Sequence, residues 1–124
     1  MALIVIVEDN VQSARMVSKL LRNADHQVVL AEDGETGLTA VFEHMPDLVL
    51  IDLGLPDIDG QTVISLLKQH SELSAPIIAF TAWPEETAHE MAMAYGCDGV
   101  ITKPIDTRAF VDQIENYLRS VQKS

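Results

Sequence analysis

Short apolar runs, rich in β-branched residues, alternate along this chain with longer stretches in which apolar residues recur at helical spacing. Each run has the length of a short strand buried on both faces. Strands that alternate with helices in this way are the pattern of βα units around a parallel sheet. The 124 residues hold five such units, which is an ordinary size for one domain. We therefore expect one α/β domain over residues 1–124, with no linker or second domain.

The helical stretches carry start and stop signals. Asn10 can cap the first helix, and Asp33-Gly34 breaks the chain after the second strand. Gly96 can end the fourth helix, and the fifth is expected to start near Asp106. The apolar stripes expected to pack on the sheet include Val11, Ala14, Val17 and Leu21, then Leu38, Val41, Phe42 and Met45, then Val63, Leu66 and Leu67.

Composition and charge exclude several classes of function. A formal charge of −11 opposes nonspecific binding to DNA, RNA or anionic lipid. No apolar stretch approaches the roughly 20 residues that span a bilayer, and the N-terminus lacks a signal-peptide pattern. The single cysteine, Cys97, rules out an internal disulfide and fits a reducing compartment. We expect a cytoplasmic protein that binds neither nucleic acid nor membrane.

Polar residues stand where four of the five apolar runs end. They are Glu8 and Asp9 after the first run, Asp52 after the third, Thr81 after the fourth and Lys103 after the fifth. In open α/β sheets, ligands bind beyond the carboxyl ends of the strands, at the point where strand order reverses. We therefore expect these side chains to form one cluster.

Three carboxylates in one pocket repel one another unless a cation or a proton intervenes. A divalent metal ion held by Glu8, Asp9 and Asp52 is the simplest answer. Magnesium fits better than zinc, because the ligands are hard oxygens without histidine or cysteine. Calcium remains an alternative, although the chain has no EF-hand loop.

A carboxylate, a metal ion, a hydroxyl and an ammonium together suit phosphoryl transfer onto an aspartate. Asp52 would attack the phosphorus in line. The metal ion and Lys103 would neutralise the equatorial oxygens, and the Thr81 hydroxyl with the following amide, that of Ala82, would bind a third oxygen.

These motifs resemble the receiver domain of response regulators in two-component signalling, and the resemblance covers nearly the whole chain. It rests on Val-Glu-Asp-Asn after the first strand, Asp52-Leu-Gly-Leu-Pro-Asp-Ile-Asp-Gly60, Thr81-Ala82 and Lys103-Pro104. The implied fold is a five-stranded parallel sheet in the order 2-1-3-4-5, doubly wound and flavodoxin-like, with helices on both faces.

The resemblance also implies the role of each residue. Mg²⁺ would be held by Glu8, Asp9, Asp52 and the Gly54 backbone carbonyl. Asp52 would accept the phosphoryl group, Thr81 would be the switch hydroxyl, and Lys103 would pair with phosphate. The peptide bond between Lys103 and Pro104 would be cis. The donor would be a phosphohistidine on a sensor kinase or a phosphotransfer domain, and small-molecule donors can sometimes substitute. The chain would catalyse only its own phosphorylation and slow dephosphorylation.

The chain departs from the family pattern at Val100, where receivers commonly carry an aromatic residue that moves inward on activation. We therefore expect any signal to travel through the loop from Thr81 to Pro84 and the fourth helix. Gly54 and Trp83 occupy positions that tune hydrolysis, and neither can orient a water as an amide or acid would. A long-lived phosphoryl group is the resulting hypothesis.

A phosphorelay partner is expected to dock on one face, which comprises Val11, Ala14, Arg15, Met16 and Ile105. Few basic residues lie on the fifth helix, which favours a monomer or weak dimer. A complete single-domain regulator is favoured over a receiver cut from a longer protein.

Other functions were weighed against the same residues. A flavin carrier of this fold would need a phosphate-binding first loop, which Glu8 and Asp9 oppose. A haloacid-dehalogenase-type hydrolase would need an acid at position 54, which is glycine. The remaining alternative is a receiver-like docking module that acts without phosphorylation. Asp57 and Asp59 are interpreted as turn or capping residues, and the histidines as surface or capping residues.

Overall fold

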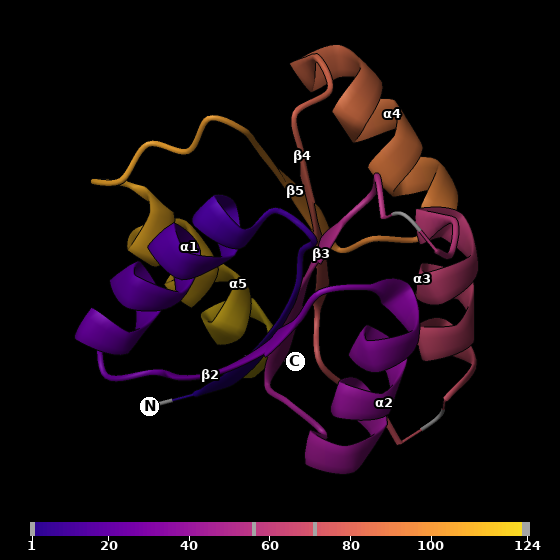
Figure 1. The fold of residues 1–124 in the computed structure, drawn as a ribbon, viewed down its shortest axis with the longest axis horizontal. Helices are drawn as coiled ribbons and strands as arrows, with labels where there is room; N and C mark the ends of the chain where they lie inside the picture. Colours follow the sequence, from indigo (N-terminus) through magenta and orange to yellow (C-terminus); the bar gives the residue numbers. More distant parts are fainter. Residues whose placement is uncertain (1, 56, 71, 123–124) are drawn as a thin grey trace.

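The computed structural model describes residues 2–55, 57–70 and 72–122, which form a single five-stranded parallel sheet and five helices (Figure 1). The strands are β1 (Leu3–Val7), β2 (Gln27–Ala31), β3 (Leu48–Asp52), β4 (Ile77–Thr81) and β5 (Gly99–Thr102). The helices are α1 (Val11–Asn23), α2 (Gly34–His44), α3 (Gly60–Gln69), α4 (Glu85–Tyr95) and α5 (Phe110–Gln122). The strand order is β2-β1-β3-β4-β5, which confirms the predicted fold.

Helices cover both faces of the sheet, with α1 and α5 on one side and α2, α3 and α4 on the other (Figure 1). Alternate side chains of a strand point to opposite faces. Thus Ile4 and Ile6 pack with α1 and α5, while Val5 and Val7 pack with the other helices. The inner strands are apolar at successive positions because both of their faces are buried.

Strand order reverses between β1 and β3. The chain runs outward from β1 to β2, then returns on the other side of β1 and continues to β5. Val7 is in register with Ile51, so the next residues, Glu8 and Asp52, emerge side by side. This reversal places polar side chains of distant segments at one edge of the sheet.

Most helix ends lie where the sequence signals place them. The Asn10 side chain accepts a hydrogen bond from the Ser13 amide at 2.9 Å and caps α1. Gly96, with φ of 90°, closes α4 in a left-handed conformation that costs glycine little. The predicted start of the fifth helix near Asp106 was too early. The segment 107–109 forms a turn, and the regular helix begins at Phe110, whose amide donates to the Asp106 carbonyl.

Several packing expectations were wrong. Four residues of the predicted stripes were expected to pack on the sheet but are exposed, namely Val11 at 58%, Phe42 at 39%, Met45 at 37% and Leu66 at 41%. His26 was expected to be a surface or capping residue, but it is buried. Its Nδ1 accepts from the Ala2 amide, and its Nε2 lies 3.1 Å from a Glu115 carboxylate oxygen. Within the described residues, no helix combines the length and apolar character needed to cross a membrane.

Candidate functional site

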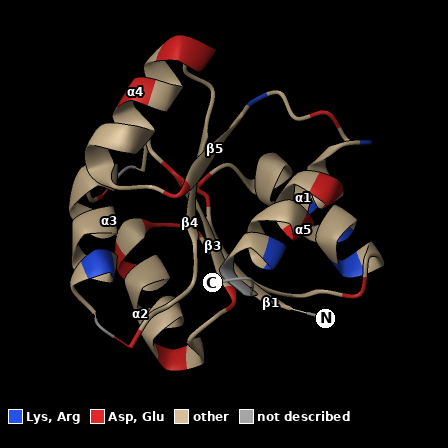
Figure 2. Cartoon of the chain, turned by 180° about the vertical axis from the view of Figure 1, so that it is seen from behind, with Lys and Arg blue, Asp and Glu red and all other residues tan. Residues whose placement is uncertain are grey.

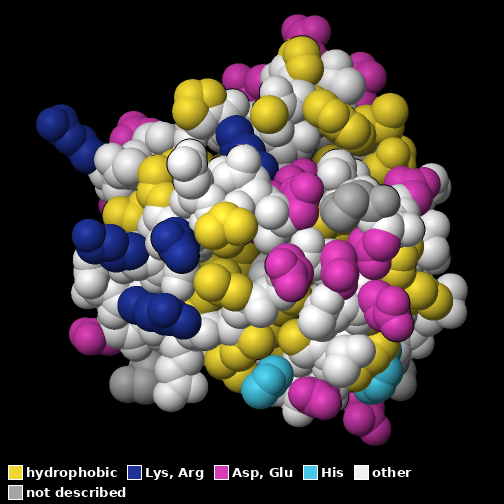
Figure 3. Space-filling model, viewed as in Figure 1, with side chains coloured by type: hydrophobic (Ala, Val, Ile, Leu, Met, Phe, Trp, Pro, Cys, Tyr) yellow, Lys and Arg dark blue, Asp and Glu magenta, His cyan; other side chains and the backbone are white. Residues whose placement is uncertain are grey.

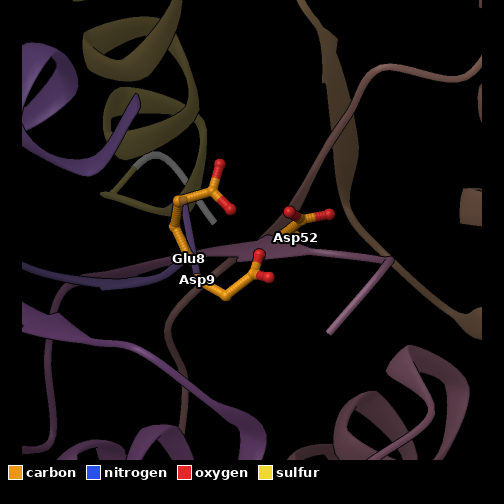
Figure 4. Close-up of side chains that lie close together, drawn as sticks. All are labelled: Glu8, Asp9 and Asp52. Carbon is orange, nitrogen blue, oxygen red and sulfur yellow. The ribbon is translucent and has the colours of Figure 1, made fainter. Parts of the chain in front are cut away.

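The predicted cluster is present at the carboxyl ends of the strands. Figure 4 shows the carboxyl groups of Glu8 and Asp9, which follow β1, beside that of Asp52 at the end of β3. One oxygen of each lies within 4.8 Å of the others. Their environments differ, since Glu8 is buried, Asp52 is partly buried and Asp9 is exposed. The cluster therefore has a buried wall and an open side.

Lys103 links two of the carboxylates. Its Nζ donates to a Glu8 Oε1 in a close ion pair, and it lies 3.3 Å from Asp52 Oδ2. The same ammonium sits 4.7 Å from the centre of the Phe80 ring, where the negative face of the ring attracts it. The Lys103–Pro104 peptide bond is cis. Three segments that are distant in the sequence thus meet at one ammonium.

The pKa values of Glu8 and Asp52 are shifted in opposite directions. Burial raises the pKa of Glu8 to about 7, and its hydrogen bond with Asp52 acts in the same direction against the effect of Lys103. Burial also pushes the pKa of Asp52 upward, but hydrogen bonds with Glu8, the Gly54 amide and Lys103 outweigh burial and lower that pKa. Asp52 is consequently ionised at neutral pH, as a nucleophile must be.

Lys103 stays charged in this setting. Burial lowers the pKa of its ammonium, but the Glu8 hydrogen bond and the charges of both acids outweigh burial, so the pKa is raised. A permanent positive charge therefore stands beside Asp52, where a transferred phosphoryl group would bring negative charge.

The remaining predicted residues lie on or directly after β3, β4 and β5. Thr81 is buried at the end of β4, and its Oγ1 accepts from the Trp83 amide at 3.2 Å. The Gly54 amide donates to Asp52 Oδ1 at 2.8 Å. Ala82 is exposed. The side chains of Trp83 and Val100 pack against the core on the α2, α3 and α4 side.

The donor set fits a magnesium ion. All the acidic ligands are hard oxygens, and Mg–O distances of about 2.1 Å require oxygens about 3 to 4.2 Å apart, which small side-chain rotations would produce from the observed cluster. A cation at this position would also reduce the repulsion among the three carboxylates. Without a metal ion, protonation of Glu8 and the charge of Lys103 reduce that repulsion. Glu8, Asp9 and Asp52 could therefore hold the ion.

The predicted partner face is only partly exposed. Val11 is 58% and Met16 42% exposed, and Arg15 is exposed as well. Ala14 is a correction, because it is buried on the face of α1 that packs on the sheet and cannot offer much surface. Ile105 is half-buried against the core formed with α1 and α5.

The sequence did not show how the loop after Asp52 is anchored. Asp57 accepts hydrogen bonds from the Gly34 and Glu35 amides at 2.8 and 3.1 Å, which lowers its pKa. It was correctly interpreted as a capping residue, but it caps α2. Asp59 caps α3. Only the three-dimensional structure pairs Asp57 with a helix that precedes it in the chain.

Comparison with known proteins identifies the class of this site. Residues 4–115 match the family described as the response regulator receiver domain. The chain belongs to this family. Among its relatives is the polar-differentiation response regulator DivK of Brucella anthropi, which is 34% identical over 116 residues that cover 93% of this chain and 94% of the relative. DivK of Brucella ovis is 34% identical with the same coverage.

Solved receiver structures share the fold. The chemotaxis response regulator CheY4 of Vibrio cholerae superposes with a TM-score of 0.87 at 23% identity and covers 94% of this chain and 98% of its own. A CheY-like receiver domain protein from Methanospirillum hungatei superposes with a TM-score of 0.88 at 22% identity. The match covers 99% of this chain and 98% of that protein's chain. The protein is thus a receiver domain of two-component signalling, with the doubly wound fold of CheY-like proteins.

Proposed function

We propose that this receiver accepts a phosphoryl group from a phosphohistidine onto Asp52 in a Mg²⁺-dependent reaction and thereby switches partner binding. The observation that carries the proposal is the meeting of Glu8, Asp9 and Asp52 with Lys103 at one edge of the sheet. The donor would be a sensor histidine kinase or a histidine phosphotransfer domain, in line with the two-component family.

The transfer begins at the Asp52 carboxylate. One of its oxygens forms a bond to phosphorus while the phosphorus–nitrogen bond of the donor breaks, and the leaving imidazole nitrogen keeps the electron pair. The lowered pKa of Asp52 keeps this nucleophile ionised. When bound at the acidic cluster, Mg²⁺ would supply positive charge to the phosphoryl oxygens.

Lys103 and Thr81 would stabilise the product. The Lys103 ammonium already lies 3.3 Å from Asp52 and would pair with a phosphoryl oxygen. Because Thr81 Oγ1 accepts from the Trp83 amide, its own proton remains available for another phosphoryl oxygen, beside the amide of Ala82. The chain would catalyse only its own phosphorylation and the slow hydrolysis of its own phosphoryl group.

The switch would act through the segment 81–84 and α4. Val100 has no ring that could move between exposed and buried positions. The segment that holds Thr81 is therefore the one expected to move when Asp52 is phosphorylated. In NMR spectra with and without beryllofluoride and Mg²⁺, amides of 81–84 should shift more than those of 102–105. Equal shifts in the two segments would contradict this route.

A long lifetime of the phosphoryl group is a further part of the proposal. Gly54 has no side chain, and the partly buried indole of Trp83 cannot orient a water as an amide or acid would. Decay followed by intact mass in Mg²⁺ should take much longer than seconds, and a half-life of seconds would refute this point.

The donor protein would dock on Val11, Arg15, Met16 and Ile105, the accessible part of the predicted face. Replacing Arg15 and Met16 with glutamate should slow transfer from a phosphohistidine donor at least tenfold. Transfer from acetyl phosphate should not change, because that donor needs no protein surface. An unchanged rate from the protein donor would exclude this docking face.

The test of the main proposal is intact mass after incubation with acetyl phosphate, with and without Mg²⁺. Wild type should gain one phosphoryl group only with the metal, and Asp52→Asn should gain none. Absence of any gain, also with a phosphorylated kinase or phosphotransfer domain, would favour the alternative, a receiver-like docking module that acts without phosphorylation.

A further inference from the structure

Strand β2 forms an open edge of the sheet. Its outer side pairs with no other strand of the described chain, because the strand order begins at β2. Its sequence, Gln-Val-Val-Leu-Ala, contains no proline and no charged residue. Natural proteins commonly place such residues on edge strands, because they hinder pairing with the strand of another molecule. The β2 edge is therefore accessible to a further strand.

The hydrogen bonds to β1 show which backbone groups of β2 point outward. The Gln27 amide donates to the Ala2 carbonyl, and the Ala31 carbonyl accepts from the Glu8 amide. Successive residues of a strand direct their backbone groups to opposite sides. The odd-numbered residues of β2 therefore bond to β1, and the even-numbered residues direct their amides and carbonyls outward.

Val28 and Leu30 are the even-numbered residues of β2. The Val28 carbonyl accepts from the Arg22 guanidinium at 3.3 Å and has a second lone pair. Among the described residues, no group beyond the β1–β2 ladder bonds to the Leu30 amide or carbonyl. The Leu30 side chain is 42% exposed and lines a groove of about 280 Å³ beside the strand. An added strand would satisfy polar groups and cover an apolar side chain.

Charge changes sign along β2. Arg22 lies beside the first half of the strand, and Glu32 follows its last residue; both are exposed. Figure 2 shows most basic residues on the side of α1 and α5. In Figure 3, basic side chains lie at the left, acidic ones toward the right and apolar ones between them, and β2 runs from the left toward the centre in the same view (Figure 1). A second β2 strand in the opposite direction would place acids beside bases at both ends.

We propose that two copies of this chain associate through their β2 edges, antiparallel and about a two-fold axis at Val29. Val28 of each copy pairs with Leu30 of the other, and the two residues exchange amide-to-carbonyl hydrogen bonds. Alternate side chains share a face, so Glu32 lies on the same face as Leu30. Glu32 of one copy thereby approaches Arg22 of the other. The two sheets become one continuous sheet.

The dimer should be weak. Each copy contributes one short strand and carries a formal charge of −11, so the contact is small and the copies repel each other at long range. Sedimentation velocity of the unphosphorylated protein between about 5 and about 500 µM should show conversion from monomer to dimer toward the upper end. The pairing needs no phosphoryl group, so the inference goes beyond the proposed function.

Two lysine substitutions with the same change in net charge separate the β2 edge from general effects. Leu30→Lys places a cation from each copy beside the two-fold axis and should weaken the dimer about tenfold or more. Leu66→Lys is the control on α3, because Leu66 is 41% exposed and Leu30 42%. It should leave the affinity within about twofold. Thermal unfolding of each variant shows that it is folded.

A charge exchange tests the antiparallel direction. Arg22→Glu and Glu32→Arg each place like charges at both ends of the seam and should each weaken the dimer about fivefold. The double variant Arg22→Glu/Glu32→Arg places opposite charges there again, in reversed order. It should dimerise within about twofold of wild type, because the two substitutions compensate each other across the interface.

Amide hydrogen exchange within β2 supplies an internal control. The outward amides of Val28 and Leu30 should exchange several-fold more slowly at about 500 µM than at about 10 µM, because they are bonded only in the dimer. The Val29 amide, which faces β1, should exchange at the same rate at both concentrations.

Three results would overturn the proposal. The first is a protein that stays monomeric at about 500 µM. The second is equal weakening of the dimer by Leu30→Lys and Leu66→Lys, and the third is a charge-exchange double variant that dimerises no better than the single variants.

Discussion

The ammonium of Lys103 holds together two acids that would otherwise repel each other. It contacts Glu8, whose side chain has no exposed surface, and Asp52, which is the candidate nucleophile. Removing one member of a buried ion pair leaves the other charge uncompensated, which is costly unless that group takes up a proton. The pKa of Glu8 near 7 means that proton uptake is within reach at ordinary pH.

Lys103→Met should therefore destabilise the protein in a pH-dependent way. We expect the free energy of unfolding to fall by about 1 to 3 kcal/mol at pH 8 and by less at pH 6, where Glu8 is neutral. Urea unfolding at both pH values measures this. Lys68→Met is the matched control, because Lys68 pairs with Asp98 at an exposed site and should cost about 0 to 1 kcal/mol. An equal loss for Lys103→Met at pH 6 and 8 would contradict the account.

Magnesium binding should depend on pH through Glu8. The folded-state pKa of about 7 lies above the ordinary value of 4.5, so protonation of Glu8 favours the folded apo protein. That contribution is fully present below about pH 4.5 and is lost as pH rises through 7. Because the metal needs the ionised carboxylate, affinity should rise from pH 6 to 8.

Calorimetry in buffers of different ionisation enthalpy measures this linkage. Near pH 6 it should detect close to one proton released per Mg²⁺, and near pH 8 much less. Glu8→Gln should bind the ion more weakly and lose the pH dependence. A wild-type affinity that stays flat between pH 6 and 8 would exclude Glu8 as the linked group.

At the scale of elements, α2 packs closely against β1 at Val7, the residue that precedes Glu8. A Cβ built on Gly37 would meet the two Val7 methyl groups at 2.7 and 2.8 Å. Val7 immediately precedes Glu8, so this close contact helps to fix the strand end that carries the acids. The absence of a side chain at Gly37 therefore has a packing role that outweighs its low helix propensity.

Gly37→Ala should destabilise the protein by about 1 to 3 kcal/mol through overpacking, although propensity alone predicts a gain of about 1 kcal/mol. Urea unfolding decides the sign. Thr39→Ala on the exposed side of the same helix is the control and should change stability by only a few tenths of a kcal/mol. If Gly37→Ala were more stable than wild type, the Val7 side chain would have shifted without a loss in the free energy of unfolding.

Local signals predicted the elements well and their contacts less well. Asn10 and Gly96 mark helix ends by their own chemistry, and the apolar runs of β1 and β3 mark buried strands. The exposure of Phe42 depends on where α2 meets α3, which periodicity does not encode. The cap that Asp57 provides to α2 likewise joins segments that are far apart in the sequence.

At the scale of the whole molecule, the site exists only when the sheet is assembled. Its acids come from positions 8, 9 and 52 and its ammonium from position 103, and the reversal of strand order is what places them together. The sequence predicted this cluster because each member ends an apolar run. It could not predict that Glu8 would be fully buried beside Lys103, because that depends on packing from both faces of the sheet.

The most direct test locates the phosphoryl group itself. Protein treated with acetyl phosphate and Mg²⁺ is reduced with borohydride, which converts an aspartyl phosphate to homoserine, and is mapped by peptide mass spectrometry. The account predicts homoserine at position 52 alone, and none when the metal is chelated or the protein is first unfolded in urea. Modification at another acid, or equal modification of folded and unfolded protein, would contradict the assignment of Asp52 as the phosphoacceptor.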